Sequence, residues 1–446
     1  MMPKSYSPQP FSSAAVCLFL VVLSCAAASA QVESVIYNFQ GTGDGGHPAS
    51  QLVADKAGNL YGTTSGGQAM GTVFELTPLT GGQWVETTLH AFTGPDGSGP
   101  AAGLIMDGKG NLFGTTLGGG NYDDGVVFEL QPVSGGWDFS VIYNFHYDGL
   151  NNFDGSLPAA PLSLDSKGNL YGTTLQGGTG QCNAANAVRQ GVAPPKGQSY
   201  YSCGTVFQLS PRGNGAWSER VIHSFQGTDG GWPAASLIFD KAGNLYGTTG
   251  LGGTGGSSCP GVEVSGCGVV FELVRNGNGN WTESVLYTFL NGNDGAEPFG
   301  GLRFDTLGDL YGSTQGALQQ GGSIFELSPT SGGTWTETTL LSLQSEAAGY
   351  GAVGNLLMDS AGNLYGTTEF GAGSAGSSAP KPAGAGTVFK LSPAQSGWTA
   401  TWLHSFGSGS DGSAPAAGLL RRGTTLYGTT YSGGTAGNGT VFKLAP

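Results

Sequence analysis

The stretch Gly-Asn-Leu-Tyr-Gly-Thr-Thr at residues 58–64 decides the fold, because it recurs along the whole chain. Copies with small changes begin at Gly110, Gly168, Gly243, Gly308 and Gly362, and a degenerate seventh copy occupies residues 425–430. Self-similarity at a period of some tens of residues is typical of solenoids, propellers and other repeat arrays. The chain is therefore expected to contain seven copies of one structural unit.

Each unit contains four short segments that have the composition of β-strands. A Pro-Ala-Ala-x-Leu-x-x-Asp segment (100–107) precedes the Leu-Tyr-Gly-Thr-Thr string. A Gly-Thr-Val-Phe-Glu-Leu segment (71–76) follows the string, and a fourth segment runs from a tryptophan to a phenylalanine (84–92). β-Branched and aromatic residues between Gly, Pro, Asn and Asp are the signature of strands. No stretch after residue 30 has helical periodicity over ten or more residues.

Four-stranded antiparallel units that cannot bury both faces alone imply radial closure. We therefore predict an all-β fold, a single seven-bladed β-propeller over residues 31–446. Residues 32–39 resemble a fourth segment without a unit before them, and the last third segment, which ends at Leu444, has no fourth segment after it. Pairing these two ends would close the ring and remove an exposed edge. An open solenoid is the alternative.

The first thirty residues resemble a secretory signal peptide. Lys4 is followed by an apolar run at residues 16–23 and an Ala-Ser-Ala end, which predicts cleavage after Ala30. A lipidated N-terminus at Cys25 is the alternative. The run is too short to span a bilayer, and no later run could do so. We expect a soluble, exported protein, either secreted or located in the periplasm or on the cell surface.

The composition limits the partners. Glycine contributes 83 of the 446 residues, which could suggest disorder. Disordered chains, however, are poor in aromatic residues and rich in charged ones, whereas here each class makes up 10%. The formal net charge is −14, so a basic stripe for phosphate contacts is absent and nucleic acid is not expected as a partner. The chain is expected to be a monomer.

Four cysteines remain after the predicted signal peptide. Cys203 and Cys267 occupy the same repeat position, and Cys182 and Cys259 both follow a Gly-Gly-Thr-Gly stretch. An even number in an exported chain suggests disulfides. The pairs Cys182–Cys203 and Cys259–Cys267 are favoured because each would close one loop, while a link between Cys203 and Cys267 is an alternative.

An Asp-Gly-x-x-Pro motif links the fourth segment to the next first segment in six units. Its aspartates are Asp44, Asp96, Asp154, Asp229, Asp294 and Asp411. The simpler interpretation is an Asp-capped turn. The alternative is a ring of carboxylates at one mouth of the axis that binds a cation such as calcium. The sixth unit lacks the motif, and no spacing typical of a zinc site is present. No cofactor is otherwise expected.

Length variation is concentrated in the links between the second and third segments. The longest links span residues 175–204, 250–268 and 369–386. They should lie on the same face as the Asp-Gly links, and variable loops on a constant scaffold are how repeat proteins build binding faces. Tolerated insertions are the alternative. Aromatic residues that could form a ligand platform there are Tyr122, Tyr200, Tyr201, Trp232 and Tyr431.

Other candidate residues are interpreted as packing residues and not as parts of an active site. His90, His223 and His404 occupy a place that holds tyrosine in other units, which indicates half-buried packing residues. The glycine inside each Leu-Tyr-Gly-Thr-Thr string is interpreted as a blade-to-blade packing position. Gln51 and Asn355 depart from the Gly, Pro or Ser of other first segments but look scattered, so no active site is assembled from them.

The repeated Gly-Asn-Leu-Tyr-Gly-Thr-Thr and Gly-Thr-Val-Phe-Glu/Lys-Leu strings resemble the tandem "GloVer" repeat of exported bacterial proteins. The Asp-x-x-Gly-Asn-Leu-Tyr part is also similar to the inner hairpin of NHL-type propellers. The first resemblance implies a bacterial secreted or surface protein of unassigned activity, without catalytic residues to carry over.

We therefore expect a non-catalytic binding module for a glycan or an envelope or secreted protein. The alternatives are a polysaccharide lyase or hydrolase that uses the axial pocket, and a structural envelope component.

Overall fold

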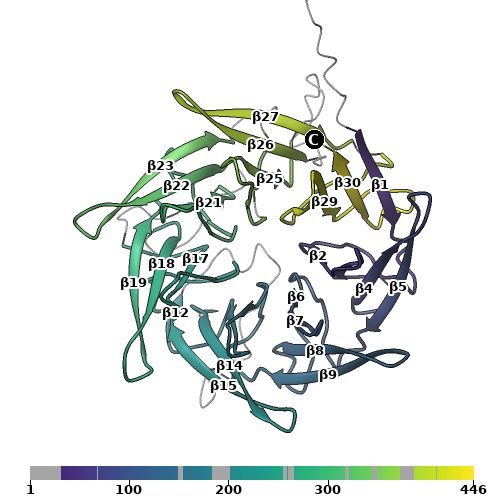
Figure 1. Cartoon of the computed structure of the whole chain (residues 1–446). Coiled ribbons are helices and arrows are strands. Elements are labelled where there is room, and N and C mark those ends of the chain that lie inside the picture. Colours follow the sequence, from purple (N-terminus) through teal and green to yellow (C-terminus); the bar gives the residue numbers. More distant parts are fainter. Residues whose placement is uncertain are drawn as a thin grey trace, which may run out of the picture. The chain divides into compact units, whose positions relative to one another are not determined.

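The structure, a computed structural model, describes residues 32–67, 69–148, 154–182, 201–254, 259, 266–316, 321–343, 349–352, 354–371, 386–407 and 409–445. Seven four-stranded antiparallel sheets are arranged as a ring (Figure 1). This confirms the seven-bladed propeller. The predicted signal peptide (1–30) and Cys25 lie outside the described residues. None of the described residues belongs to a helix long and apolar enough to cross a membrane.

The blades follow one another along the chain, each with its innermost strand first. Blade 1 consists of β2 (Val53–Ala54), β3 (Leu60–Thr64), β4 (Thr72–Pro78) and β5 (Trp84–Ala91). Blade 2 consists of β6 (Ile105–Met106), β7 (Leu112–Thr116), β8 (Val126–Val133) and β9 (Gly136–Asn144). Blade 3 consists of β10 (Ser163–Leu164), β11 (Leu170–Thr174), β14 (Thr205–Gly213) and β15 (Ala216–Ser224). Its long link contains the small ribbon β12 (Gln181–Cys182) and β13 (Tyr201–Ser202).

The remaining blades repeat this order. Blade 4 consists of β16 (Ile238–Phe239), β17 (Leu245–Thr249), β18 (Val269–Arg275) and β19 (Trp281–Thr288). Blade 5 consists of β20 (Arg303–Phe304), β21 (Leu310–Thr314), β22 (Ser323–Pro329) and β23 (Trp335–Ser342). Blade 6 consists of β24 (Leu357–Met358), β25 (Leu364–Thr368), β26 (Thr387–Ala394) and β27 (Gly397–Ser405). Blade 7 consists of β28 (Leu420–Arg422), β29 (Thr425–Thr430), β30 (Thr440–Ala445) and β1 (Val32–Asn38).

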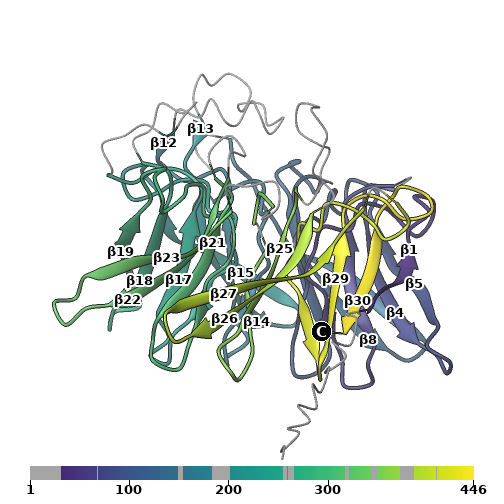
Figure 2. The same cartoon turned by 90° about the horizontal axis from the view of Figure 1, so that it is seen from above.

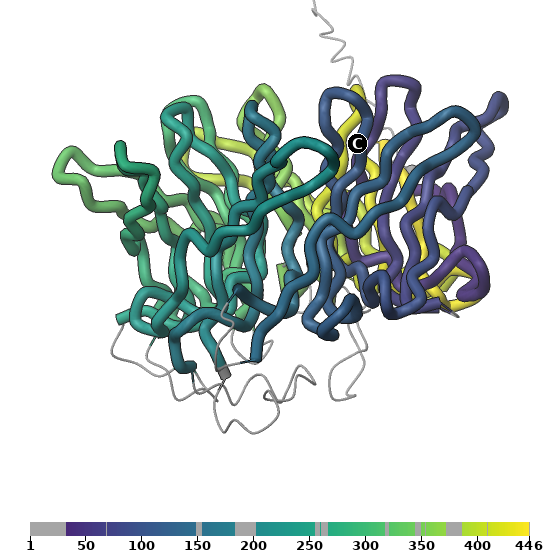
Figure 3. Tube along the Cα trace, turned by 90° about the horizontal axis from the view of Figure 1, so that it is seen from below, coloured from purple at the N-terminus to yellow at the C-terminus, as the bar shows by residue number. Residues whose placement is uncertain are grey.

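The two ends of the chain close the ring. β1 pairs antiparallel with β30, from Val32 opposite Ala445 to Asn38 opposite Thr440. The purple start and the yellow end of the strands lie side by side in Figures 1 and 3. The predicted closure is confirmed, and the open solenoid is wrong. The pairing covers what would otherwise be a free β30 edge, the kind of edge that invites association.

Edge-to-face phenylalanine pairs join neighbouring blades. The phenylalanine after the outer strand of one blade meets the third-strand phenylalanine of the next blade, with ring centroids 5.0–5.3 Å apart. The pairs are Phe39–Phe74, Phe92–Phe128, Phe145–Phe207, Phe225–Phe271, Phe289–Phe325 and Phe406–Phe442. Between blades 5 and 6, Leu343 packs in the same cluster as Phe389. Aromatic pairs of this geometry stabilise beyond the area they bury.

The glycine inside each second strand has a different partner from the one expected. A Cβ at Gly172 would lie 2.5 Å from Phe207 Cζ and 2.9 Å from Leu162 Cδ2. Both side chains belong to the same blade, and Phe207 lies directly opposite Gly172 in the β11–β14 register. The interpretation as a direct blade-to-blade contact is therefore wrong. The missing side chain makes room for the phenylalanine ring that then contacts the preceding blade.

Gly172→Ala is expected to destabilise the protein by about 1–3 kcal/mol, because the added methyl group overpacks this ring. Gly108→Ala is the matched control, since nothing lies within 4 Å of a Cβ at Gly108, and its effect should stay within about 0.5 kcal/mol. Urea unfolding of both variants measures the difference. Equal effects would contradict the packing role.

Both predicted disulfides are present, Cys182–Cys203 and Cys259–Cys267. All four cysteines are buried. Cys182 and Cys203 join the β12–β13 ribbon to the start of β14, and Cys267 precedes β18. Structural disulfides of this kind indicate a compartment outside the reducing cytoplasm.

Candidate functional site

The Asp-Gly links and the links between the second and third strands lie on one face, as expected. Bridges join the link before an inner strand to the link after the second strand of the same blade. They are Gly46–Gly66, Ser98–Gly118, Ser156–Gln176, Gly231–Leu251, Tyr350–Phe370 and Ser413–Ser432. We call this the link face. Figure 2 shows β12 and β13 at this face and the β4–β5 hairpin at the opposite one. The central parts of the links 175–204, 250–268 and 369–386 lie outside the described residues.

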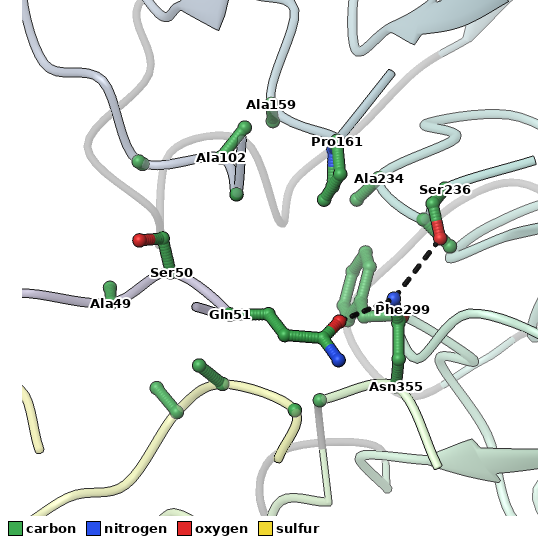
Figure 4. A pocket seen from close by; sticks show the side chains of 17 residues that line it. Ala49, Ser50, Gln51, Ala102, Ala159, Pro161, Ala234, Ser236, Phe299 and Asn355 are labelled. Atoms are coloured by element: carbon green, nitrogen blue, oxygen red, sulfur yellow. Dashed lines mark hydrogen bonds between the residues drawn. The ribbon is translucent and has the colours of Figure 1, made fainter. Parts of the chain in front are cut away.

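A cavity of about 210 Å³ lies on the propeller axis below this face (Figure 4). Its walls come from the inner segments of the blades. Small residues form most of these walls, as the Pro-Ala-Ala pattern predicts: Ala49, Ala101, Ala159, Ala234 and Ala416. In blade 5, Phe299 takes the place of alanine and adds one aromatic ring. None of the described residues that line the cavity has a titratable side chain.

Polar side chains from distant blades meet at the bottom of this cavity. Asn355 Nδ2 donates hydrogen bonds to Gln51 Oε1 at 3.3 Å and to Ser236 Oγ at 3.2 Å. Figure 4 draws these two hydrogen bonds, which join Gln51, Asn355 and Ser236 in one chain of side chains. The view that Gln51 and Asn355 are scattered is therefore wrong. The two residues are far apart in the sequence, but both side chains point toward the propeller axis. We call these three residues the axial bridge.

Backbone groups of two further blades hold the axial bridge in place. Gln51 Nε2 donates to Leu419 O at 3.0 Å, and Gly301 N donates to Asn355 Oδ1 at 2.9 Å. A Cβ at Gly301 would lie only 2.3 Å from Asn355 Oδ1. The bridge thus connects blades 1, 4, 5, 6 and 7. Its three residues also line a second cavity of about 300 Å³, together with Leu52, Leu104, Leu162, Leu237 and Leu420 at or just before the inner strands.

The backbone at the cavity rim is strained in five blades. In these blades the residue before the inner-segment proline has a left-handed φ between 56° and 59°; these residues are His47, Leu157, Trp232, Glu297 and Ala414. Gly99, which precedes Pro100, and Gly351, which precedes Ala352, hold the equivalent positions in the other two blades with positive φ and without strain. Strained conformations persist only where the surroundings enforce them, and they are concentrated at functional sites.

The six aspartates cap their own turns. Asp44 accepts hydrogen bonds from Gln40 N at 2.8 Å and Thr42 N at 3.2 Å, and Asp96 accepts one from Thr93 N at 2.8 Å. Each aspartate also contacts the tyrosine or histidine of the preceding outer strand. The pairs are Tyr37–Asp44, His90–Asp96, Tyr143–Asp154, His223–Asp229, Tyr287–Asp294 and His404–Asp411. The capped-turn interpretation is confirmed, and the structure distributes these carboxylates one per blade boundary.

This pairing explains why tyrosine and histidine share one position, because both present a polar atom to the aspartate. Burial lowers the pKa of His90 and of His404, although the neighbouring carboxylate opposes this. Burial acts to raise the pKa of Asp96, but hydrogen bonds from Thr93 and His90 outweigh it and lower the pKa. Burial, reinforced by the hydrogen bond to Asp154, raises the pKa of Tyr143 far above its ordinary value. These tyrosines stay protonated at physiological pH.

The candidate platform residues differ in exposure. Tyr122 is 52% exposed and stacks on His146 with ring centroids 3.9 Å apart, while Tyr431 is 40% exposed and stacks on His47 at 4.7 Å. Trp232 is only 1% exposed and packs in the core, so it does not form a surface platform. Tyr200 lies outside the described residues, and for Tyr201 only the backbone, in β13, is described.

Comparison with known proteins bears on the repeat and on the fold. Residues 21–186 and 191–379 match the family model of the Gloeobacter/Verrucomicrobia repeat, which confirms the resemblance seen in the sequence. No curated protein matches the sequence. Among solved structures, a protein of unknown function from Dyadobacter fermentans DSM 18053 is 11% identical with a TM-score of 0.44, covering 92% of this chain and 96% of its own. A putative 6-phosphogluconolactonase from Bacteroides uniformis ATCC 8492 is 12% identical with a TM-score of 0.39, covering 78% and 94%.

Proposed function

The chain belongs to the Gloeobacter/Verrucomicrobia repeat family, and we propose that this member is an exported binding module whose axial cavity receives the end of a neutral glycan. The observation that carries the proposal is the combination of the axial bridge with the single aromatic ring of Phe299 in an otherwise small-residue cavity. The disulfides support the exported location.

The chemistry of the cavity fits an uncharged, hydroxyl-rich ligand. Amide and hydroxyl groups of Gln51, Asn355 and Ser236 offer donors and acceptors without charge. Phe299 offers an apolar face on which the carbon side of a sugar ring can pack. Ligand sites commonly combine mostly apolar walls with a few convergent polar groups.

Binding is favoured over catalysis by the same lining. A lyase or hydrolase needs a positioned acid or base near the reacting bond. The described walls offer alanine, glycine, proline, serine, amide and phenylalanine side chains instead. The exposed Tyr122–His146 and Tyr431–His47 stacks on the link face could extend contact with a longer chain or with an envelope protein.

The test uses the full mature chain and neutral oligosaccharides, with affinity measured by isothermal titration calorimetry. Phe299→Ala and Asn355→Ser copy residues that other blades carry at the same places, so both variants should fold. Each is expected to weaken binding at least tenfold, the loss of one or two good contacts, about 1.4 kcal/mol or more. Tyr122→Ala is the control outside the cavity.

Binding that is unaffected by Phe299→Ala and Asn355→Ser would overturn the axial site. Binding that is lost only in Tyr122→Ala or Tyr431→Ala would move the site to the link face. Turnover of a polysaccharide that is lost in Asn355→Ser would favour the enzyme alternative. The structural role would follow if no oligosaccharide or envelope protein bound at all.

A further inference from the structure

We propose that the boundary between blades 3 and 4 binds one divalent transition-metal ion of the Zn²⁺ class, through His223, Asp229 and Glu283. Among the described parts of the chain, these are the one set of three or more metal-ligating side chains whose ligand atoms all lie within 4.8 Å of one another. The site is independent of the axial cavity and of the glycan proposal.

Neighbouring blades bring the three side chains together. His223 lies on β15, Asp229 lies in the link that follows β15, and Glu283 lies on β19 of the next blade. Gln226 N donates to Asp229 Oδ1 at 2.7 Å, which leaves Oδ2 facing His223 Nε2 at 3.1 Å. The side chains of His223 and Asp229 keep 18% and 19% of their exposure, so an ion can reach them from solvent.

The distances and charges suit a divalent ion. Zinc binds imidazole nitrogen and carboxylate oxygen at about 2.0–2.2 Å, so adjacent ligands of a tetrahedral site lie about 3.3 Å apart. The 3.1 Å between His223 Nε2 and Asp229 Oδ2 is close to that spacing. A neutral imidazole and two carboxylates together carry two negative charges, which the ion would balance. Three protein ligands leave a fourth position for water or a ligand atom.

Glu283 is the least satisfied member of the set. Its Oε1 is buried and has no hydrogen-bond partner among the described residues. A buried carboxylate beside a second carboxylate is costly unless a cation pairs with both.

Comparison with the other blade boundaries shows that the histidine distinguishes the proposed metal site. Where tyrosine replaces histidine, its hydroxyl donates to the aspartate, and a glutamate occupies the place of Glu283. These sets are Tyr37–Asp44–Glu86, Tyr143–Asp154–Glu219 and Tyr287–Asp294–Glu337. A protonated tyrosine supplies no ligand comparable to imidazole, so we expect no transition-metal site there.

Two further boundaries carry histidine and provide internal comparisons. His90 pairs with Asp96, but Phe139 replaces the glutamate and stacks on the imidazole with centroids 3.6 Å apart. His404 lies 3.4 Å from Asp411, and Glu33 is the neighbouring carboxyl group. This last set repeats the residue types of the proposed site, so an experiment on the blade 3–4 boundary must first remove it.

The experiment starts from a His404→Tyr parent of the full mature chain, stripped with a chelator and titrated with Zn²⁺ alone by calorimetry at pH 7.5. One ion per chain is expected. Adding His223→Tyr recreates the arrangement at Tyr287, so the fold should be kept, and Zn²⁺ binding should fall at least a hundredfold. Glu283→Gln should weaken it at least tenfold.

A second readout tests coordination directly. Co²⁺ bound by imidazole and carboxylates should give visible absorption bands in the parent that His223→Tyr abolishes, while Ca²⁺ should compete weakly because it prefers six to eight oxygens. The proposal is overturned if the parent binds no Zn²⁺, if His223→Tyr leaves binding unchanged, or if Ca²⁺ displaces Zn²⁺ at equal concentration. Phe139→Glu, which adds the missing carboxylate beside His90, is expected to raise the stoichiometry by one.

Discussion

Deleting residues 31–39 is expected to make the chain unfold far more easily and associate with other copies. The deletion removes β1, exposes the β30 edge and takes away Phe39, which is fully buried against Phe74. Losing a buried phenylalanine alone costs about 3–5 kcal/mol. Unpaired edges also promote strand addition between molecules. Thermal unfolding and size-exclusion chromatography measure the two effects.

The chain supplies the matched control for this deletion. Leu343 directly follows the outer strand of blade 5, as Phe39 follows the outer strand of blade 7, and it is fully buried as well. Phe39→Leu should therefore cost less than about 1.5 kcal/mol and leave the oligomeric state of the parent unchanged. A truncated chain that kept both the melting temperature and the oligomeric state of the parent would show that β1 contributes little to closure.

Stability is expected to fall as the pH rises from about 5 to about 8, in contrast to a protein held together by ionised carboxylates. Burial, reinforced by the nearby Asp154 carboxylate, raises the pKa of Glu219 to about 8. The pKa values of Glu33 and Glu369 are raised to about 7, mainly by burial. A group whose pKa is higher in the folded state holds its proton there while the unfolded chain releases it, so its contribution is lost as the pH passes through the folded pKa.

Glu219→Gln isolates this effect, since the amide imitates the protonated acid at every pH. The variant and the parent should have similar melting temperatures at pH 5, and the variant should be more stable by several degrees at pH 9. His90 and His404, whose pKa values are lowered, act in the opposite direction between pH 5 and 6.5, but equally in both proteins. A parallel pH dependence in the two proteins would contradict the assignment to Glu219.

The architecture could be predicted because the repeat indicates both the number of blades and the order of the strands within each blade. Seven copies of one string fix seven blades, and the unmatched segment at 32–39 fixes the closure. The disulfides followed from the same logic, since Cys203 and Cys267 share a repeat position. Each of these inferences depends on contacts within a blade or between adjacent blades, which local sequence encodes.

The site could be predicted only in part, because its contacts cross the ring. Gln51 and Asn355 lie 304 positions apart and differ in type, so nothing in the sequence pairs them. The aspartate partners were hidden by variable spacing, which is six residues for His90–Asp96 but eleven for Tyr143–Asp154. The burial of Trp232 had no signal in the repeat, because His47 and Leu157, which hold the same place before the inner-segment proline, are only half-buried.

The axial bridge has a consequence for the passage of solutes along the axis. Gln51, Ser236 and Asn355 line both axial cavities, so a solute in either cavity meets the same amide and hydroxyl groups. The residues around them differ, mainly alanine in the upper cavity and leucine, valine and isoleucine in the other. Movement of a solute between the two cavities therefore depends on how these three side chains are held.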